Sequence, residues 1–182
     1  LEWNKFSMSA LRLINETEIT STVTSVDVTD VFSADFDIYK IVCTLKESSA
    51  GQQQYARLRF INSSGTVKSS SNYDYAQHKV LATGTELEQR STTADNLLYF
   101  GNPFTDDTGG TSTIYVFNPY SSSSYSFVLG QGSYTSSASL QTVKGIGVYH
   151  QAETVTGFQF YQSSGSMGSG SIIRTYGLRV DS

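Results

Sequence analysis

Few residues in this chain are of a type and spacing that would support acid–base or nucleophilic chemistry. The two histidines, His78 and His150, stand in separate segments that alternate polar and apolar residues, and no Gly-x-Ser-x-Gly turn accompanies them. The single cysteine, Cys43, lies in an apolar run at 39–45, where a free cysteine behaves as a small core side chain. A nucleophile needs a base within hydrogen-bond reach, so we expect no catalytic residue.

Carboxylates come in local pairs, and two acids about 5–9.5 Å apart across a cleft would suit a glycoside hydrolase. Nothing in the sequence distinguishes one pair from another. The polar segment 102–110 has enough oxygen atoms for Ca²⁺ but lacks the regular ligand spacing of a calcium loop, which favours an ordinary turn. We therefore expect no enzymatic activity, no metal site and no cofactor. The pairs are Glu16 with Glu18, Asp35 with Asp37, Glu86 with Glu88, and Asp106 with Asp107.

Tyrosine is the most informative residue type, because twelve tyrosines stand against one tryptophan. A tyrosine ring stacks on protein or sugar while its hydroxyl stays hydrogen-bonded in water, which suits an interface. Tyrosines also fill the faces of β-sandwiches, so packing is the competing interpretation. The candidates for contact with a partner protein or a glycan are Tyr115, Tyr120, Tyr125, Tyr134, Tyr149 and Tyr161.

The elements that carry these residues are predicted to be strands. Apolar residues are 38% and charged residues 15% of the chain, a polar composition common in β-proteins. The net charge of −4 and the scattered basic residues argue against a nucleic-acid partner. No apolar stretch approaches the ~20 residues of a membrane span, so we expect no membrane insertion.

Two segments show the strand pattern most clearly. Alternate residues from Tyr39 to Leu45 are apolar, and Ala56, Leu58 and Phe60 alternate in the same way. These two segments are predicted to form a hairpin joined through Ser-Ser-Ala-Gly at 48–51. The residues expected to be buried across the chain are Ile41, Cys43, Leu45, Leu58, Phe60, Val116, Phe158, Phe160 and Ile172.

Nine further strands bring the expected total to eleven, and 86–96 is the one segment expected to form a short helix. With no helix long enough for a βαβ crossover, the pattern favours an all-β, antiparallel β-sandwich of jelly-roll type. We expect one domain over 1–182, with 1–8 as an extended N-terminal arm. The further strands are 6–14, 20–28, 73–82, 97–100, 113–118, 125–129, 143–150, 155–161 and 171–180.

A series of short motifs, in order along the chain, resembles a β-sandwich structural module of tailed-bacteriophage virions, as in cyanophage-like capsid-surface or tail proteins. The resemblance covers residue 6 to the C-terminus and brings no catalytic residues with it. The motifs are SALRLI at 9–14, FDIYKIV at 36–42, ARLRF at 56–60, SNYDYA at 71–76, IYVFNP at 114–119, VTGFQF at 155–160 and IIRTYGL at 172–178.

The resemblance implies a non-enzymatic virion surface protein that is assembled in the host cytoplasm. A short chain without heptads favours a capsid decoration protein that contacts other virion proteins as a homo-oligomer, such as a trimer. The alternative is a tail fibre or tail adaptor module that recognises a host surface glycan. A polysaccharide-cleaving enzyme and a cellular carbohydrate-binding module are weaker alternatives from other classes.

Overall fold

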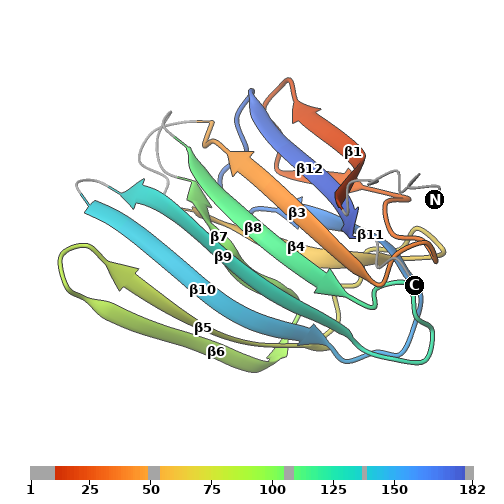
Figure 1. Ribbon diagram of the computed structural model, residues 1–182. Helices are drawn as coiled ribbons and strands as arrows, with labels where there is room; N and C mark the ends of the chain where they lie inside the picture. Colours follow the sequence, from red (N-terminus) through yellow and green to blue (C-terminus); the bar gives the residue numbers. More distant parts are fainter. Residues whose placement is uncertain (1–10, 49–53, 105–108, 137–138, 179–182) are drawn as a thin grey trace, which may run out of the picture.

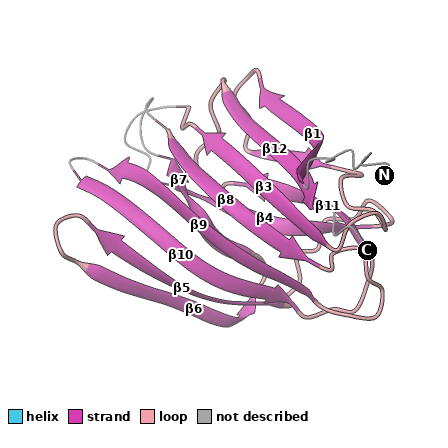
Figure 2. Cartoon of the chain, viewed as in Figure 1, coloured by secondary structure: helices cyan, strands magenta, loops and turns pink. Residues whose placement is uncertain are grey.

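The computed structural model describes residues 11–48, 54–104, 109–136 and 139–178, and this part of the chain is entirely β-structure and loops (Figures 1 and 2). The proposed arm at 1–8 and the pair Asp106 and Asp107 lie outside the described residues. No described helix is long and apolar enough to cross a membrane. The strands are β1 (Leu11–Ile19), β2 (Ser25–Val28), β3 (Ile38–Leu45), β4 (Gln54–Asn62), β5 (Tyr73–Leu81), β6 (Glu86–Ala94), β7 (Leu97–Phe104), β8 (Gly110–Phe117), β9 (Ser126–Ser136), β10 (Ser139–Tyr149), β11 (Val155–Tyr161) and β12 (Ser171–Leu178).

The strands form two sheets that pack face to face. The larger sheet has eight strands in the order β1-β12-β3-β8-β9-β10-β5-β6, and the smaller has four in the order β2-β11-β4-β7. Neighbouring strands are antiparallel throughout both sheets. The smaller sheet lies behind the larger one in Figure 1. The predicted antiparallel β-sandwich is therefore confirmed.

The core lies between the sheets and follows the predicted alternation. Tyr39 and the three alternate residues after it on β3 point inward, as do Leu58 and Phe60 on β4. The rings of Phe158 and Phe160 on β11 meet edge to face, with their centroids 5.3 Å apart. Eight of the nine residues predicted to be buried are buried.

Ile172 is the exception, because the alternation of β12 turns it outward and places Ile173 in the core instead. Ile172 is half-buried, whereas Ile173 is fully buried opposite Cys43 in the neighbouring strand. Two adjacent isoleucines leave the inward face undecided from periodicity alone, since one step along a strand reverses the side.

The hairpin predicted between the segments now seen as β3 and β4 does not form. β3 pairs with β8 and β12 in the larger sheet, and β4 pairs with β7 and β11 in the smaller. Each strand has one apolar face, and both faces cover the same core from opposite sides. The two strands therefore pack face to face instead of pairing edge to edge.

The segment expected to be a short helix is strand β6. It pairs with β5 as a hairpin whose turn includes Gly84 at φ +93°, a conformation that favours glycine. The adjacent β-branched residues Thr92 and Thr93 also favour a strand. Five consecutive residues at the start of β6 are exposed, so both faces of this edge strand meet solvent. In Figure 1 this hairpin lies at the outer end of the larger sheet.

Candidate functional site

The outer face of the larger sheet is apolar at one end and polar at the other. Strand register aligns the outward side chains into rows that cross the sheet. We call the two apolar rows together the apolar band. Its first row is Leu11, Leu178, Ile38, Phe117, Phe127, Val148 and Asp74, and its second row is Leu13, Tyr176, Lys40, Tyr115, Leu129, Ile146, Ala76 and Arg90.

The next two rows of the same face are mostly hydroxyl-bearing or charged, and each begins and ends with a glutamate at the edges of the sheet. The side chains of β8 and β9 in these rows are threonine, serine and glutamine. The third row is Glu16, Arg174, Val42, Thr113, Gln131, Lys144, His78 and Glu88, and the fourth is Glu18, Ile172, Thr44, Thr111, Ser133, Thr142, Val80 and Glu86.

Several large side chains of the apolar band are open to solvent. Ile146 is 61% exposed, and Phe127 and Leu13 are each 51% exposed. Eight strands spaced about 4.8 Å apart span about 34 Å, and two rows with their side chains are about 14 Å wide, which gives the band a footprint of roughly 480 Å², part of it covered by the charged residues Lys40, Arg90 and Asp74. Apolar patches of about 300–600 Å² are the largest found on typical monomers and are often functional.

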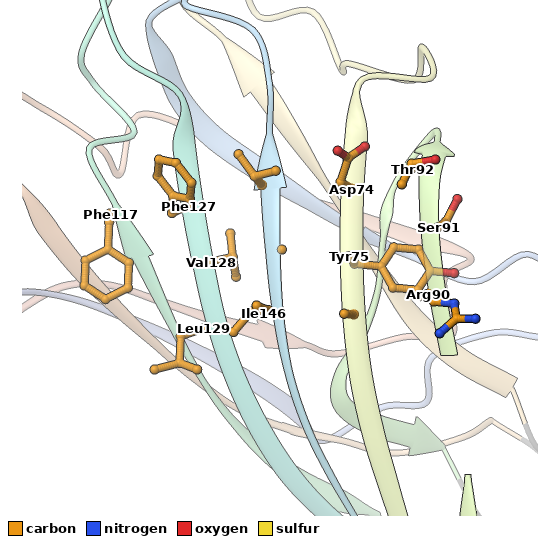
Figure 3. A pocket seen from close by; sticks show the side chains of 13 residues that line it. Asp74, Tyr75, Arg90, Ser91, Thr92, Phe117, Phe127, Val128, Leu129 and Ile146 are labelled. Atoms are coloured by element: carbon orange, nitrogen blue, oxygen red, sulfur yellow. The ribbon is translucent and has the colours of Figure 1, made fainter. Parts of the chain in front are cut away.

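The band deepens into a groove over β10 and β5, with a volume of about 800 Å³ (Figure 3). We call it the outer groove. Phe127 and Leu129 line it on the β9 side, and Arg90 and Thr92 line it on the β6 side. The small residues of its lining, such as Ala76, leave room between these walls. The lining offers apolar surface with a few polar groups at one rim, which is the pattern of a binding site.

A smaller depression of about 380 Å³ continues the groove along the same two strands. It shares Ala76, Arg90 and Ile146 with the outer groove and adds Lys144 and Glu88. The combined surface is thus mainly apolar at the end near Phe127 and carries charged side chains at the end near Lys144 and Glu88.

Of the six predicted contact tyrosines, three lie on or near the solvent-facing surface of the larger sheet. Tyr115 belongs to the second row of the band, where the Lys40 ammonium is 5.9 Å from its ring centroid. Tyr120 and Tyr125 are 40% and 46% exposed in the connection between β8 and β9. The ring of Tyr125 contacts that of His150 at 6.5 Å between centroids.

Tyr134 and Tyr149 point inward, and this corrects their assignment to an interface. Tyr134 is 4% exposed and donates a hydrogen bond to Gln141, while Tyr149 is fully buried. Both occupy strand positions whose alternation faces the smaller sheet. Tyr161 lies apart from the groove on the smaller sheet, where its ring is 4.1 Å from the Arg59 guanidinium carbon. The tyrosines therefore do not form one site.

Sequence reasoning missed the groove because its exposed side chains are phenylalanine, leucine and isoleucine instead of tyrosine. A detectable pattern existed in the strands β9 and β10. Phe127, Val128 and Leu129 are three consecutive apolar residues. Because successive side chains of a strand point to opposite faces, both faces of this strand carry apolar side chains, including the face that meets solvent.

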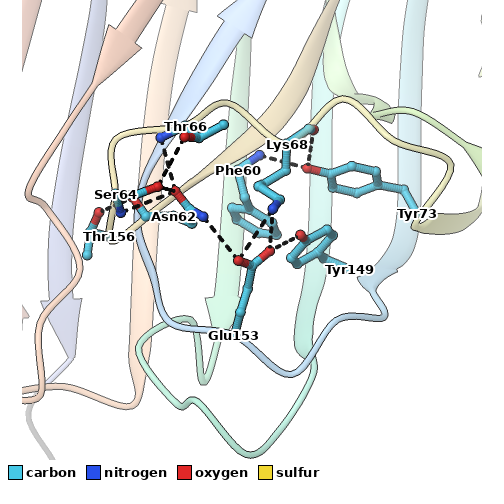
Figure 4. A network of polar contacts seen from close by, with 9 residues as sticks. All are labelled: Phe60, Asn62, Ser64, Thr66, Lys68, Tyr73, Tyr149, Glu153 and Thr156. Atoms are coloured by element: carbon cyan, nitrogen blue, oxygen red, sulfur yellow. Dashed lines mark hydrogen bonds and ion pairs between the residues drawn. The ribbon is translucent and has the colours of Figure 1, made fainter.

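A network of polar contacts surrounds Glu153, beyond the end of β10 (Figure 4). Its carboxylate accepts hydrogen bonds from Tyr149 and from Asn62 Nδ2 at 3.1 Å, and Lys68 Nζ lies 3.0 Å away. Tyr73 connects to the network by donating to the Lys68 carbonyl at 2.9 Å. Burial acts to raise the pKa of Glu153, but these hydrogen bonds and the lysine charge outweigh it and lower the pKa. The ionised Glu153 therefore links the end of β4, the loop that carries Lys68 and the end of β10.

Cys43 and the two histidines each contact a neighbouring polar side chain. Cys43 is buried, its sulfur is 2.8 Å from Ser112 Oγ, and burial raises its pKa to about 11, so it is an inert thiol at neutral pH. His78 lies 3.3 Å from Glu86, and His150 lies 3.4 Å from Asp74. Within the described ranges, no three His, Cys, Asp or Glu side chains gather in a way that would hold a metal ion.

Comparisons of the chain with protein-family models, curated proteins and solved structures give no significant match. The fold and surface therefore define a class only: an antiparallel β-sandwich with an unequal pair of sheets and an apolar groove on the larger one.

Proposed function

We propose that this chain is a non-enzymatic structural protein on the outside of a tailed-phage particle, and that it binds neighbouring virion protein through the apolar band. The sequence motifs support the phage assignment, and the outer groove supports the mode of action. Ile146 and Phe127 are both more than half exposed on this face. A partner that covers them stabilises the complex by roughly 25 cal/mol per Å² of apolar surface removed from water.

The chemistry of the groove favours protein over sugar as the partner. A sugar presents many hydroxyl groups, and each one that is buried without a hydrogen-bond partner costs about 1–3 kcal/mol. The β9 side of the groove offers Phe127, Val128 and Leu129, whereas its polar groups, Asp74 and Arg90 among them, lie on β5 and β6. Apolar protein side chains meet this lining without that cost, and a capsid decoration protein needs such contacts.

A second candidate is a tail module that recognises a host surface glycan, and one observation favours it. Tyr120 and Tyr125 are both exposed in the connection between β8 and β9, and the ring of Tyr125 contacts that of His150. Aromatic rings stack on sugar faces, and the hydroxyl and imidazole groups supply hydrogen bonds.

The test is quantitative mass spectrometry of purified particles of the phage that encodes the chain, with the wild-type chain compared with Ile146→Glu. Hundreds of copies per particle support capsid decoration, and a few to a few dozen support the tail candidate. Ile146→Glu should prevent incorporation, because it places a charge in the groove. Leu140→Glu is the matched control, since Leu140 is 54% exposed on the same strand but lies outside the groove. Absence of the wild-type chain from the particle would refute the proposal.

A further inference from the structure

We propose that the free edge of β6 pairs antiparallel with β6 of a second copy, so that two chains share one continuous sheet about a two-fold axis. The inference goes beyond the proposed function and does not rest on it, because the contact leaves Phe127 and Ile146 of the apolar band open to another partner. Its basis is the pattern of main-chain groups and charges that this edge strand presents to a copy of itself.

Of the four edge strands in the two described sheets, β6 is the best suited to pairing. It is nine residues long, and its ladder with β5 runs without a register shift from Glu86 to Ser91 (Figure 1). At the other edge of the larger sheet, a bulge interrupts β1 between Leu13 and Asn15, and bulges commonly block edge pairing. In the smaller sheet, β2 has only four residues, and β7 pairs with β4 through a register shift.

The main-chain groups that β6 offers to a partner belong to every second residue. Leu81 N donates to the Thr85 carbonyl at 2.8 Å, so these two residues form a hydrogen-bonded pair at the turn of the hairpin. Such pairs alternate with non-hydrogen-bonded pairs along an antiparallel ladder. The N–H and C=O groups of Glu86, Glu88 and Arg90 therefore point away from β5. Main-chain groups of this kind hold a strand that is added to a sheet edge.

The charges on the same residues favour one register. An antiparallel pair of β6 strands centred on Gln89 places Glu88 of each copy opposite Arg90 of the other. Both side chains are exposed, and no ion pair joins either of them to another described residue. Opposite charges that face each other across two strands stabilise the pair. The same two positions exchange about four main-chain hydrogen bonds, because their main-chain groups face the partner.

The neighbouring registers that keep this main-chain pairing bring like charges together. A pair centred on Glu88 places that carboxylate opposite its own copy, and a pair centred on Arg90 does the same with two guanidinium groups. Like charges directly opposite each other destabilise a strand pair. A two-fold contact also uses both β6 edges, so the assembly closes as a dimer. The order of charges along β6 thus selects a closed dimer in a single register.

The test is sedimentation velocity of the full chain at up to about 1 mM, a range in which a weak dimer forms. Wild-type protein should dimerise. Glu88→Arg and Arg90→Glu should each weaken dimerisation by about tenfold, because each places like charges opposite each other twice. Glu18→Arg is the matched control and should dimerise like wild type, since it makes the same charge change at the opposite edge of the sheet. A wild-type monomer throughout, or a dimer that both charge reversals leave unchanged, would overturn the proposal.

Mixing the two charge-reversed chains tests the register. A heterodimer of the Glu88→Arg chain with the Arg90→Glu chain has opposite charges across both pairs, so the mixture should form a 1:1 heterodimer with about the wild-type affinity. The double variant that carries both changes should dimerise with itself for the same reason. Because both positions are exposed, far-UV circular dichroism should show the wild-type fold for each chain. Failure of both rescues in folded chains would overturn the register.

A cysteine at the two-fold axis gives a geometric readout. In this register Gln89 faces its own copy in a non-hydrogen-bonded pair, where Cα atoms are about 4.5 Å apart and a disulfide can form. Gln89→Cys should therefore cross-link under oxidising conditions. Leu87→Cys is the control on the same face of the strand and should not cross-link, because its two copies lie about 13 Å apart along the strands. The native Cys43 is buried and does not interfere. Equal cross-linking of the two variants would contradict the proposed contact.

Discussion

Replacement of Phe160 by alanine is the most direct test of the sandwich. Phe160 is 3% exposed on β11, packs against Phe158 at 5.3 Å between centroids, and faces the larger sheet. Emptying a buried phenylalanine site costs about 3–5 kcal/mol through lost transfer free energy and the cavity left behind. For a domain of this size, 1 kcal/mol lowers Tm by about 2–4 °C, so we expect a loss of roughly 6–20 °C.

The assay is equilibrium urea unfolding, and the expected result is a lower midpoint with an unchanged m-value. Phe127→Ala is the matched control, since it makes the same substitution at a side chain that is 51% exposed on the outer face. Its cost should stay within about 0.5–1 kcal/mol in the monomer. A cost below ~1 kcal/mol for Phe160→Ala would refute the assigned register of β11, because a one-residue shift turns that side chain to solvent.

Three further predictions test other parts of the fold. Cys43 should resist alkylation at pH 8 in the native chain and react only on unfolding, because it is buried and its pKa is raised to about 11; rapid native-state labelling would contradict its placement. The lowered pKa of Glu153 means that its contribution to stability is present above the unfolded carboxyl pKa of about 4.3 and is lost as pH falls through the lower folded pKa. Urea midpoints measured from pH 7 to pH 3 should therefore fall less steeply for Glu153→Gln than for wild type, and parallel curves would show that the network is not formed. Gly157→Ala should unfold the chain or cost several kcal/mol, because a Cβ there would lie 2.3 Å from the Val28 carbonyl oxygen; a circular dichroism melt close to that of wild type would exclude this close approach.

Most strands of the core were predictable because the alternation of apolar and polar residues along each one indicates which side chains are buried. Alternation from Tyr39 to Leu45 alone determines which face of β3 is dry. Where two apolar residues are adjacent, as at Ile172 and Ile173, periodicity leaves the face open, and only pairing with β3 decides it.

Pairing between distant strands was beyond prediction from local pattern. β3 lies between β8 and β12, which are far from it along the chain. The order of strands in a sheet depends on which apolar faces cover the same core, and a local pattern does not contain that information. The same limit applies to the candidate site. Tyr134 and Tyr149 carry an interface-prone side chain, but strand orientation buries them, while Phe127 and Ile146 become exposed through the same alternation.

The glutamates that end the two polar rows govern how the larger sheet meets others of its kind. If β6 of one chain were to extend the sheet by pairing in register with β1 of another, Glu88 would lie opposite Glu16, and Glu86 opposite Glu18. Like charges directly opposite each other destabilise a strand pair, and charged edges are a common defence against open-ended sheet growth. This register of edge-to-edge pairing is therefore disfavoured, even though both edge strands of the larger sheet are nine residues long.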